Sequence, residues 1–286
     1  MKLSPRILLA TLALAGSTSA FAWIDSGHMV IAAIASRRLT PKAFKECERL
    51  AKIGTTEKAN TFISEACWAD DTRDAITGPW HYINFHFRGD GKPVEHQPAE
   101  QNVVWAIKKY SAILGDKTKP DEERAEAMRY LIHFVGDVHQ PLHAVARDSD
   151  EFPNGDRGGN DFPILLGDQF KGVANPPANL HALWDFGCGI LKEEPRPLDP
   201  EGYGRMLILA DKLAAEAPEK QAKNVNDLNP DDWAEESFGI AKNICYNLKP
   251  NTPLDEGYMH IGRLFSLQRI TTAGYRLAKL LNQLVG

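Results

Sequence analysis

Cysteine is scarce in this chain: there are four among 286 residues, at positions 47, 67, 188 and 245. No two of them form a Cys-x-x-Cys pair, which argues against a thiolate zinc site. Beyond the first 22 residues, no segment has the roughly 18 consecutive apolar residues of a membrane-spanning helix. The chain also lacks an Asn-x-Ser/Thr sequon, so no N-glycosylation is implied.

Basic charge is in the minority. The chain has 33 Lys and Arg residues and 38 Asp and Glu residues, which gives a formal net charge of -5. Removing residues 1–22, which hold Lys2 and Arg6 and no acidic residue, leaves 31 basic residues and a net charge of −7. This balance argues weakly against nucleic-acid binding. Bound metal ions would add concentrated positive charge, so net charge does not decide the question.

The first 22 residues have the order of a secretory signal peptide. Lys2 and Arg6 precede the apolar run ILLATLALAG, and the Ala-x-Ala-like STSAFA follows. Cleavage after Ala22 would leave Trp23 as the first residue of an exported chain, secreted or periplasmic. The remaining length suits one large domain, or at most two small ones. We therefore expect a signal peptide at 1–22 and a mature domain at 23–286.

An exported chain with four cysteines allows two disulfides in three pairings. We favour Cys47–Cys67 and Cys188–Cys245, because Cys67 lies three residues before Asp70 and Cys188 three residues after Asp185. Both aspartates are candidate ligands, as argued below, so each bridge would brace a segment that carries one. Four buried free thiols are the alternative.

Helical signals cover most of the chain. Apolar periodicity, capping residues and breakers predict helices over 25–39, 40–54, 55–76, 102–114, 121–140, from 179, over 201–217 and 231–246, and from 255 to the end. Asp25 or Ser26 is the expected N-cap of the first helix. Pro141 should end the fifth, turning His143 away from the preceding face. The Gly-, Pro- and Asp-rich stretch 148–177 is one long loop, whose run 162–170 is a candidate for a small β-hairpin. The predicted fold is one compact all-α domain.

Histidine and aspartate gather in two short segments. The residues are His133, Asp137 and His143 in the first segment, and His181 and Asp185 in the second. A spacing of four puts the His and the Asp of each pair on one face of a helix. Imidazole and carboxylate together suit Zn²⁺ or a similar divalent ion. Two such pairs and a further His are too many for one tetrahedral ion, so we predict a multinuclear site.

Three further residues are candidates for the same site. His28 lies five residues after Trp23, so its ring and the free α-amine could meet on one ion, and Asp70 and His81 flank a turn. A lone histidine is more often a surface or core residue than a ligand. We assign that role to four others: His86 and His96, placed in a polar loop, His139, which points off the metal-binding face, and the isolated His260.

An ordered set of motifs resembles the S1/P1 nuclease family. The motifs are Trp23 at a processed N-terminus, Trp-x4-His (23–28), Trp-Ala-Asp (68–70), His-Tyr-Ile (81–83), HFVGDVHQPLH (133–143), Gly-Gly-Asn (158–160) and LHALWD (180–185). The resemblance implies a mainly α-helical fold of the type shared with trinuclear zinc phospholipase C. It also implies three Zn²⁺ ions and cleavage of single-stranded DNA, RNA and 3′-nucleotides, leaving 5′-phosphates.

The resemblance further implies a role for each candidate ligand. One zinc would be held by Asp70, His81, His133 and Asp137. A second, bridged by Asp137, would be held by the amine and carbonyl of Trp23 together with His28. The third, more open ion would be held by His143, His181 and Asp185. A hydroxide shared by the two close ions would then attack phosphorus, because zinc lowers the pKa of bound water from about 15.7 to about 7.

The substrate contacts come from the same resemblance. Arg73 matches the family's phosphate-binding arginine, and Asn160 would be a further contact to phosphate, so Asp70, Arg73 and Asn160 are the expected catalytic residues. Tyr82 matches an aromatic position that stacks a base. Asn84 replaces an acidic residue of fungal members, and an amide offers both a donor and an acceptor. The base preference is therefore open.

Two alternatives to a secreted zinc nuclease stay open. The first is a phospholipase C that uses the same trinuclear centre on a lipid phosphodiester. The second is a non-catalytic, zinc-binding periplasmic protein. Arg73 and the Trp-Ala-Asp context favour the nuclease over the first, and the complete ligand set with an open third ion argues against the second. We expect a monomer.

Overall fold

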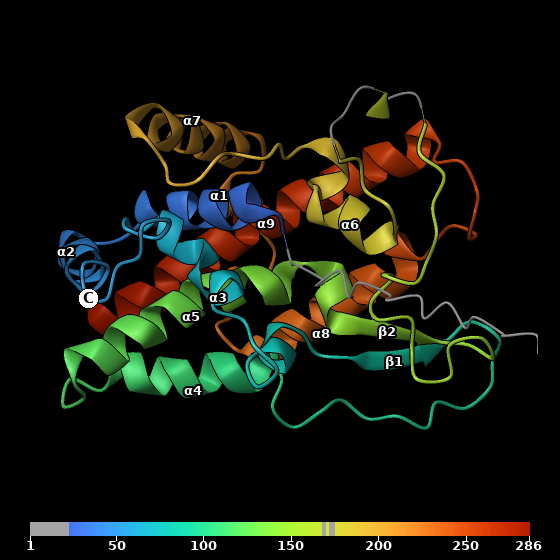
Figure 1. Ribbon diagram of the computed structural model, residues 1–286, viewed down its shortest axis with the longest axis horizontal. Coiled ribbons are helices and arrows are strands. Elements are labelled where there is room, and N and C mark those ends of the chain that lie inside the picture. Colours follow the sequence, from blue (N-terminus) through green and yellow to red (C-terminus); the bar gives the residue numbers. More distant parts are fainter. Residues whose placement is uncertain (1–22, 168–169, 172–174) are drawn as a thin grey trace, which may run out of the picture.

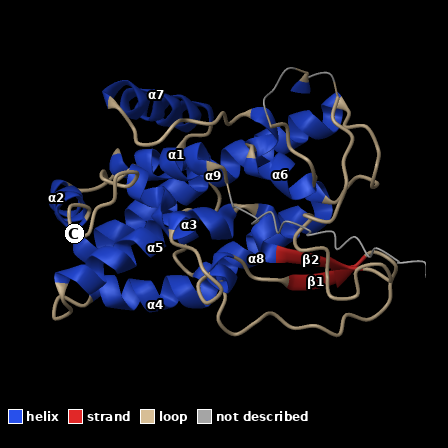
Figure 2. Cartoon of the chain, in the orientation of Figure 1, coloured by secondary structure: helices blue, strands red, loops and turns tan. Residues whose placement is uncertain are grey.

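Helices dominate the part of the chain that the computed structural model describes, residues 23–167, 170–171 and 175–286 (Figure 2). The α-helices are α1 (Asp25–Ser36), α2 (Pro41–Leu50), α3 (Trp68–Asp71), α4 (Val103–Gly115), α5 (Asp121–His139), α6 (Leu180–Asp185), α7 (Pro200–Glu216), α8 (Pro230–Ile240) and α9 (Glu256–Val285). Short helical turns are η1 (Ser64–Cys67), η2 (Gly78–His81), η3 (Pro141–Ala144), η5 (Gly187–Gly189), η6 (Glu219–Gln221) and the π-turn η7 (Ala241–Cys245). The all-α class predicted from the sequence is confirmed.

Helix α5 runs through the centre of the molecule and packs against α1, α4, α8 and α9 (Figure 1). All its residues from Ala127 to His139 are buried, which is the pattern of a helix surrounded on every side. Its first turn is acidic and it ends before Pro141, as the sequence predicts. Polar side chains on the buried part of such a helix are costly unless they find partners. His133 and Asp137 lie in that part, so their partners must come from neighbouring elements.

Several predicted helix starts are confirmed, and one predicted helix is wrong. The side chains of Thr40 and Asn102 accept hydrogen bonds from the first turns of α2 and α4. Helix α1, in contrast, has Ile24 at its N-cap position without a side-chain cap, where Asp25 or Ser26 was expected. The segment 55–76 is mostly turns, with only η1 and α3 helical. It bonds to α5 instead: the Ala66 carbonyl accepts from His133, and the Glu65 carboxylate accepts from Arg129.

The one sheet among the described residues joins two strands far apart in the chain. Strand β1 (Phe85–Arg88) pairs in parallel with β2 (Val145–Asp148) (Figure 2). The hairpin expected at 162–170 is a wrong prediction for the described residues of that run. Its backbone instead makes single bridges to distant segments, Pro163 to Asn179 and Leu165 to Pro253. Residues 168 and 169 of the run lie outside the described residues.

All four cysteines lie in the described part of the chain and are buried free thiols, so neither expected disulfide is formed. Cys67 donates from Sγ to the carbonyl of Asp25, which directs its thiol toward α1. Burial raises the pKa of Cys47 and of Cys188 to about 12, which keeps both in the unreactive thiol form. None of the described helices has the length and apolar character needed to cross a membrane. The expected signal peptide, 1–22, lies outside the described residues.

Replacing Glu236 with glutamine is expected to lower the free energy of unfolding by about 3 kcal/mol at pH 7. Glu236 on α8 accepts hydrogen bonds from Arg269 and Arg276 of α9, whose guanidinium groups are buried. The substitution would leave two buried cations without their carboxylate. Urea unfolding of the Glu236→Gln variant measures the loss, with exposed Glu235→Gln as the control. Equal effects of the two substitutions would contradict this role.

The stability lost in Glu236→Gln is expected to depend on pH. Burial acts to raise the pKa of Glu236, but Arg276 and Arg269 outweigh burial and lower the pKa from 4.5 to about 2. Because the pKa is lower in the folded state, the carboxylate stabilises the fold above pH 4.5, and this contribution is lost as the pH falls toward 2. The stability difference between wild type and Glu236→Gln should therefore shrink over that window.

Candidate metal centre

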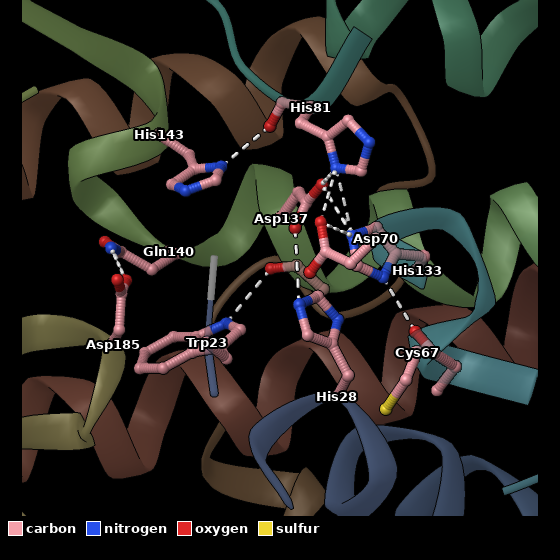
Figure 3. Close-up of polar contacts among 12 residues, drawn as sticks. Trp23, His28, Cys67, Asp70, His81, His133, Asp137, Gln140, His143 and Asp185 are labelled. Atoms are coloured by element: carbon pink, nitrogen blue, oxygen red, sulfur yellow. Dashed lines mark hydrogen bonds and ion pairs between the residues drawn. The ribbon is translucent and has the colours of Figure 1, made fainter. Parts of the chain in front are cut away.

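His133 and Asp137 lie one turn apart on α5 and meet on its buried face, as their spacing predicts. His133 Nε2 is 3.2 Å from Asp137 Oδ2. His81, at the end of η2, brings its Nδ1 to 3.0 Å from the same oxygen and 3.1 Å from His133 Nε2 (Figure 3). Trp80 fixes this approach, because its ring packs against Tyr110 of α4 and Tyr130 of α5.

Asp70 reaches the same point from α3. Its Oδ1 lies 3.4 Å from His81 Nδ1 and 3.6 Å from His133 Nε2. The short helix is held against α5 by an edge-on contact between the rings of Trp68 and Tyr130. Asp70, His81 and His133 therefore form one group in which each residue can offer a ligand atom.

His28 approaches Asp137 from the opposite side. Its Nε2 is 3.4 Å from Asp137 Oδ1, and its ring stacks on that of His133 at 3.9 Å. Gly136 permits this contact, because a Cβ at this position would lie 2.8 Å from His28 Nδ1. Asp137 thus presents one oxygen to His28 and the other to His81 and His133.

Trp23 is fully buried beside this group. Its indole Nε1 donates to the carbonyl of Gly136 (Figure 3). The next residue, Ile24, donates from its backbone to the carbonyl of Asp185. Gly27 allows the close packing, since a Cβ there would lie 2.5 Å from Trp23 Cβ. These contacts anchor Trp23 between His28 and Asp185.

A third group lies beyond the end of α5. His143 on η3 and His181 on α6 face each other with their Nε2 atoms 3.2 Å apart, and Asp185 Oδ2 is 3.7 Å from His181 Nε2. Pro141 ends α5 and turns His143 away from the face of His133, as the sequence predicts. Gln140 donates to Asp185 Oδ1 at 2.6 Å. Gln140 was not among the predicted site residues, although it lies between two histidines of the motif.

Backbone carbonyls orient three of the imidazoles. The Nδ1 atoms of His133, His143 and His181 donate to the carbonyls of Ala66, His81 and Gly158, respectively, at 2.7–2.8 Å. When such a ring is neutral, its Nε2 atom carries a lone pair that can bind a cation. This is the arrangement in which a ligating histidine donates its other ring N–H to an outer partner. Nε2 of His143 and Nε2 of His181 face each other in this way, which suits a cation between them.

The clustered charges shift the pKa values of the group strongly. Burial lowers the pKa of His133, but Asp137 and Asp70 outweigh burial and raise it to about 9. Burial also tends to raise the pKa of Asp137, yet His133 and His81 hold it well below its usual range. Burial, together with the negative charges of Asp70 and Asp137, holds the pKa of Asp185 well above its usual range despite the hydrogen bond from Gln140. Without a cation the cluster therefore keeps protons, and binding a metal would release them.

Unpaired buried atoms show that the residues fit a metal. Within the described chain, buried atoms without a hydrogen-bond partner include His28 Nε2, Asp70 Oδ1 and Asp137 Oδ1, all of which face the group. Most buried polar atoms are paired, so a concentration of orphans at one place calls for a missing partner. A divalent cation of borderline softness matches this set of imidazole and carboxylate donors.

The expected substrate residues occupy the neighbourhood of these groups. Arg73 lies one turn after Asp70, with its Nη1 4.0 Å from Asp70 Oδ1 and its Nη2 donating to Gly78 O. Asn160 is half-buried and donates to Arg157 O, two residues beyond the carbonyl that orients His181. Tyr82 and Asn84 are half-buried and follow directly on His81.

The remaining histidines divide into two kinds. His139 is buried and hydrogen-bonded to Val135 O and Arg276, and His260 is exposed, so neither joins the groups above. The prediction that His86 and His96 lie in a polar loop is confirmed for His96 and wrong for His86. His86 lies in strand β1, and both rings contact Asp148.

A helical molecule with two groups of His and Asp side chains on its central helix, and a third beyond the end of that helix, defines a candidate multinuclear metalloprotein. A family model described as S1/P1 Nuclease matches residues 23–286, so the chain belongs to this family and is a nuclease. Endonuclease 2 of Arabidopsis thaliana is 27% identical over 284 residues, covering 92% of this chain and 91% of the relative.

Two fungal relatives match over shorter regions. Nuclease P1 of Penicillium citrinum is 29% identical over 175 residues, covering 57% of each chain. Nuclease S1 of Aspergillus oryzae is 29% identical over 193 residues, covering 63% of this chain and 60% of the relative. These names agree with the family resemblance that the sequence motifs indicate.

Replacing Gly158 with alanine is expected to weaken metal binding at the His143–His181–Asp185 group by about 10- to 100-fold. Gly158 has φ +62°, and a Cβ there would lie 2.3 Å from Leu142 O and 3.3 Å from His181 Nδ1. The backbone must shift, and it carries the carbonyl that orients His181. Zinc titration against a chelating dye measures the loss. Gly239→Ala, where a Cβ meets open space, should bind zinc like the wild type.

Proposed function

We propose that this nuclease is a zinc-dependent endonuclease that hydrolyses single-stranded DNA and RNA to 5′-phosphate products and also acts as a 3′-nucleotidase. The observation that carries the proposal is the convergence of three His/Asp groups, two of which share His133, on one buried site. Three groups support three Zn²⁺ ions. Family membership supports the nucleic-acid substrate.

Nine residues are proposed as ligands. Asp70, His81, His133 and Asp137 would hold one zinc. Trp23, through its amine and carbonyl, and His28 would hold a second, with Asp137 shared between the two. His143, His181 and Asp185 would hold the third. Support comes from the oxygens of Asp137, which face His28 on one side and His81 and His133 on the other.

The chemistry of the site follows from its charges. Zinc, when bound, would lower the pKa of a water ligand from about 15.7 to about 7 and so supply the nucleophile near neutral pH. Asp70 would act in two ways. Its carboxylate would bind the zinc ion of the Asp70–His81–His133 group, and it also lies beside the guanidinium of Arg73. The planar guanidinium of Arg73 would donate to phosphate oxygens as negative charge grows on them. Asn160 would donate its amide to the same phosphate.

Tyr82 and Asn84 are the proposed base contacts. Both are half-buried and follow His81, so a base stacked on Tyr82 would lie close to a phosphate held at Arg73. Stacking on an aromatic ring contributes roughly 1–3 kcal/mol per base and requires an unpaired base. This requirement favours single strands. The amide of Asn84 can both donate and accept, which predicts a relaxed base preference.

Export belongs to the same proposal. Residues 1–22 would be removed as a signal peptide, and residues 23–286 would form one monomeric catalytic domain in the periplasm or outside the cell. Removal matters chemically, because only a free amine at Trp23, and not a peptide nitrogen, can donate to zinc.

End-group analysis of digested single-stranded DNA tests the activity. Zinc-loaded protein beginning at Trp23 should yield fragments with 5′-phosphates, and a chelator should abolish cleavage. Arg73→Gln should bind zinc normally and cleave at least about 100-fold more slowly. Cleavage that persists in chelator would overturn the zinc mechanism. Release of phosphocholine from phosphatidylcholine without any cleavage of DNA or RNA would contradict the proposed nuclease activity and indicate a phospholipase C.

A further inference from the structure

A fourth group of potential metal ligands lies outside the centre described above. His86, His96 and Asp148 come from strand β1, the loop that follows it and strand β2, and their ligand atoms all lie within 4.8 Å of one another. None of the motifs that define the main centre includes them.

The strand register explains how two of these residues meet. His86 pairs with Ala146, and Asp148 lies two residues further along β2, so both side chains point to the same face of the ribbon. His86 Nδ1 is 2.6 Å from Asp148 Oδ1. Gly155 covers this contact closely, since a Cβ there would lie 3.4 Å from both Asp148 Oδ1 and His86 Cε1, and 2.7 Å from Ala146 Cβ.

His96 completes the group from the loop. Its Nδ1 is 3.5 Å from the second oxygen of Asp148, Oδ2, and its ring lies 4.8 Å from that of His86. This Nδ1 is buried yet has no hydrogen-bond partner in the described chain. Arg88, on the same face of β1, is committed to Asp90 and Asp150. The charged partners shown for Asp148 are thus the two imidazoles.

The geometry is close to that of a small coordination sphere. Zinc binds imidazole nitrogen and carboxylate oxygen at about 2.0–2.2 Å in a tetrahedron, which puts neighbouring ligand atoms roughly 3.3–3.5 Å apart. The observed separations from the carboxylate are 2.6 and 3.5 Å. At His86 the separation from the carboxylate would have to widen by about 0.7–0.9 Å to admit an ion. His96 is 39% exposed, which leaves room for water as the fourth ligand.

We propose that His86, His96 and Asp148 form a separate binding site for one divalent transition-metal ion, with Zn²⁺ as the natural candidate. Two imidazoles and one carboxylate form a ligand set that suits this class of ion over Ca²⁺ or Mg²⁺. The ion would tie the loop at 89–102 to both strands. Those strands lead directly from His81 and His143, so the site would brace two ligand segments of the main centre from their far ends.

Metal counting on the chain beginning at Trp23 tests the site. The His96→Gln variant should fold normally, because the ring that it replaces makes no hydrogen bond through its buried nitrogen. After dialysis against micromolar Zn²⁺, we expect wild type to hold one more equivalent than His96→Gln, with affinity for that equivalent at least about 100-fold weaker in the variant. Exposed His260→Gln is the matched control and should keep the full count.

Hydrogen exchange supplies an independent readout. Zinc should slow exchange over residues 89–102 in wild type and in His260→Gln, and this protection should be lost in His96→Gln and in His86→Gln. Equal zinc counts and equal protection in wild type and both variants would overturn the site and leave a metal-free His–Asp–His cluster. The comparison is a difference between variants, so it stands whether or not the main centre holds three ions or cleaves nucleic acid.

Discussion

Asp137→Asn should lose nuclease activity by about 1,000-fold or more while keeping its helical fold. Asp137 lies between His28 on one side and His81 and His133 on the other, with a different oxygen toward each side. Asparagine keeps the shape but removes the negative charge and replaces one oxygen with an NH₂ group, which cannot bind a cation. Both ions proposed to share this residue should therefore bind weakly.

The charges around Asp137 make this loss specific. Its carboxylate raises the pKa of His133, and His133 and His81 hold the pKa of Asp137 well below its usual range, so Asp137 is ionised at neutral pH. A neutral amide leaves three imidazoles without their shared anion. The variant should consequently bind fewer zinc ions, and higher zinc concentrations should restore activity only in part.

The test measures three properties of the Asp137→Asn variant: its activity on single-stranded DNA, its zinc content and its circular dichroism. Asp211→Asn is the control, because Asp211 is exposed on α7 and pairs only with Arg37 among the contacts that the structure shows. A folded Asp137→Asn protein with full zinc content and a near wild-type rate would show that Asp137 is not a ligand of the metal centre.

The sequence predicted the parts of the centre that depend on short spacing. The pairs His133/Asp137 and His181/Asp185 need only a helix to bring their side chains onto one face, and α5 and α6 are both helical. The effect of Pro141 is equally local, since proline ends a helix whatever surrounds it. The motif order then assigned Asp70 and His81 to the same site, although the segment between 55 and 76 is not the helix that its composition suggested.

Contacts across long sequence separations were the ones that could not be predicted. Strands β1 and β2 are about 60 residues apart and only four residues long, which is too short for a periodic pattern to reveal. Their pairing turns His86 from a loop residue into a neighbour of Asp148. Gln140 and Gly158 were missed for a related reason, because each acts on Asp185 or His181 through the folded chain.

A chain that begins one residue earlier, at Ala22, should bind one zinc equivalent fewer than a chain that begins at Trp23, and should lose activity by about 100-fold or more. The reason is the nitrogen of Trp23. As a free amine it has a lone pair for a metal, whereas in a peptide bond that lone pair is delocalised into the carbonyl. The two proteins otherwise share every residue of the described structure.

The anchoring of Trp23 means that the two proteins should differ only at the nitrogen of this residue. Its indole is fully buried and bonded to Gly136 O, and Ile24 is bonded to Asp185 O, so the extra residue cannot be absorbed by sliding the chain. Both proteins should therefore unfold at similar temperatures once zinc is removed. Trimming Ala22 with an aminopeptidase should restore the missing zinc and the rate together. If the chain beginning at Ala22 already holds full zinc and cleaves at the full rate, the amine is not a ligand, and His28 and Asp137 must hold their ion without it.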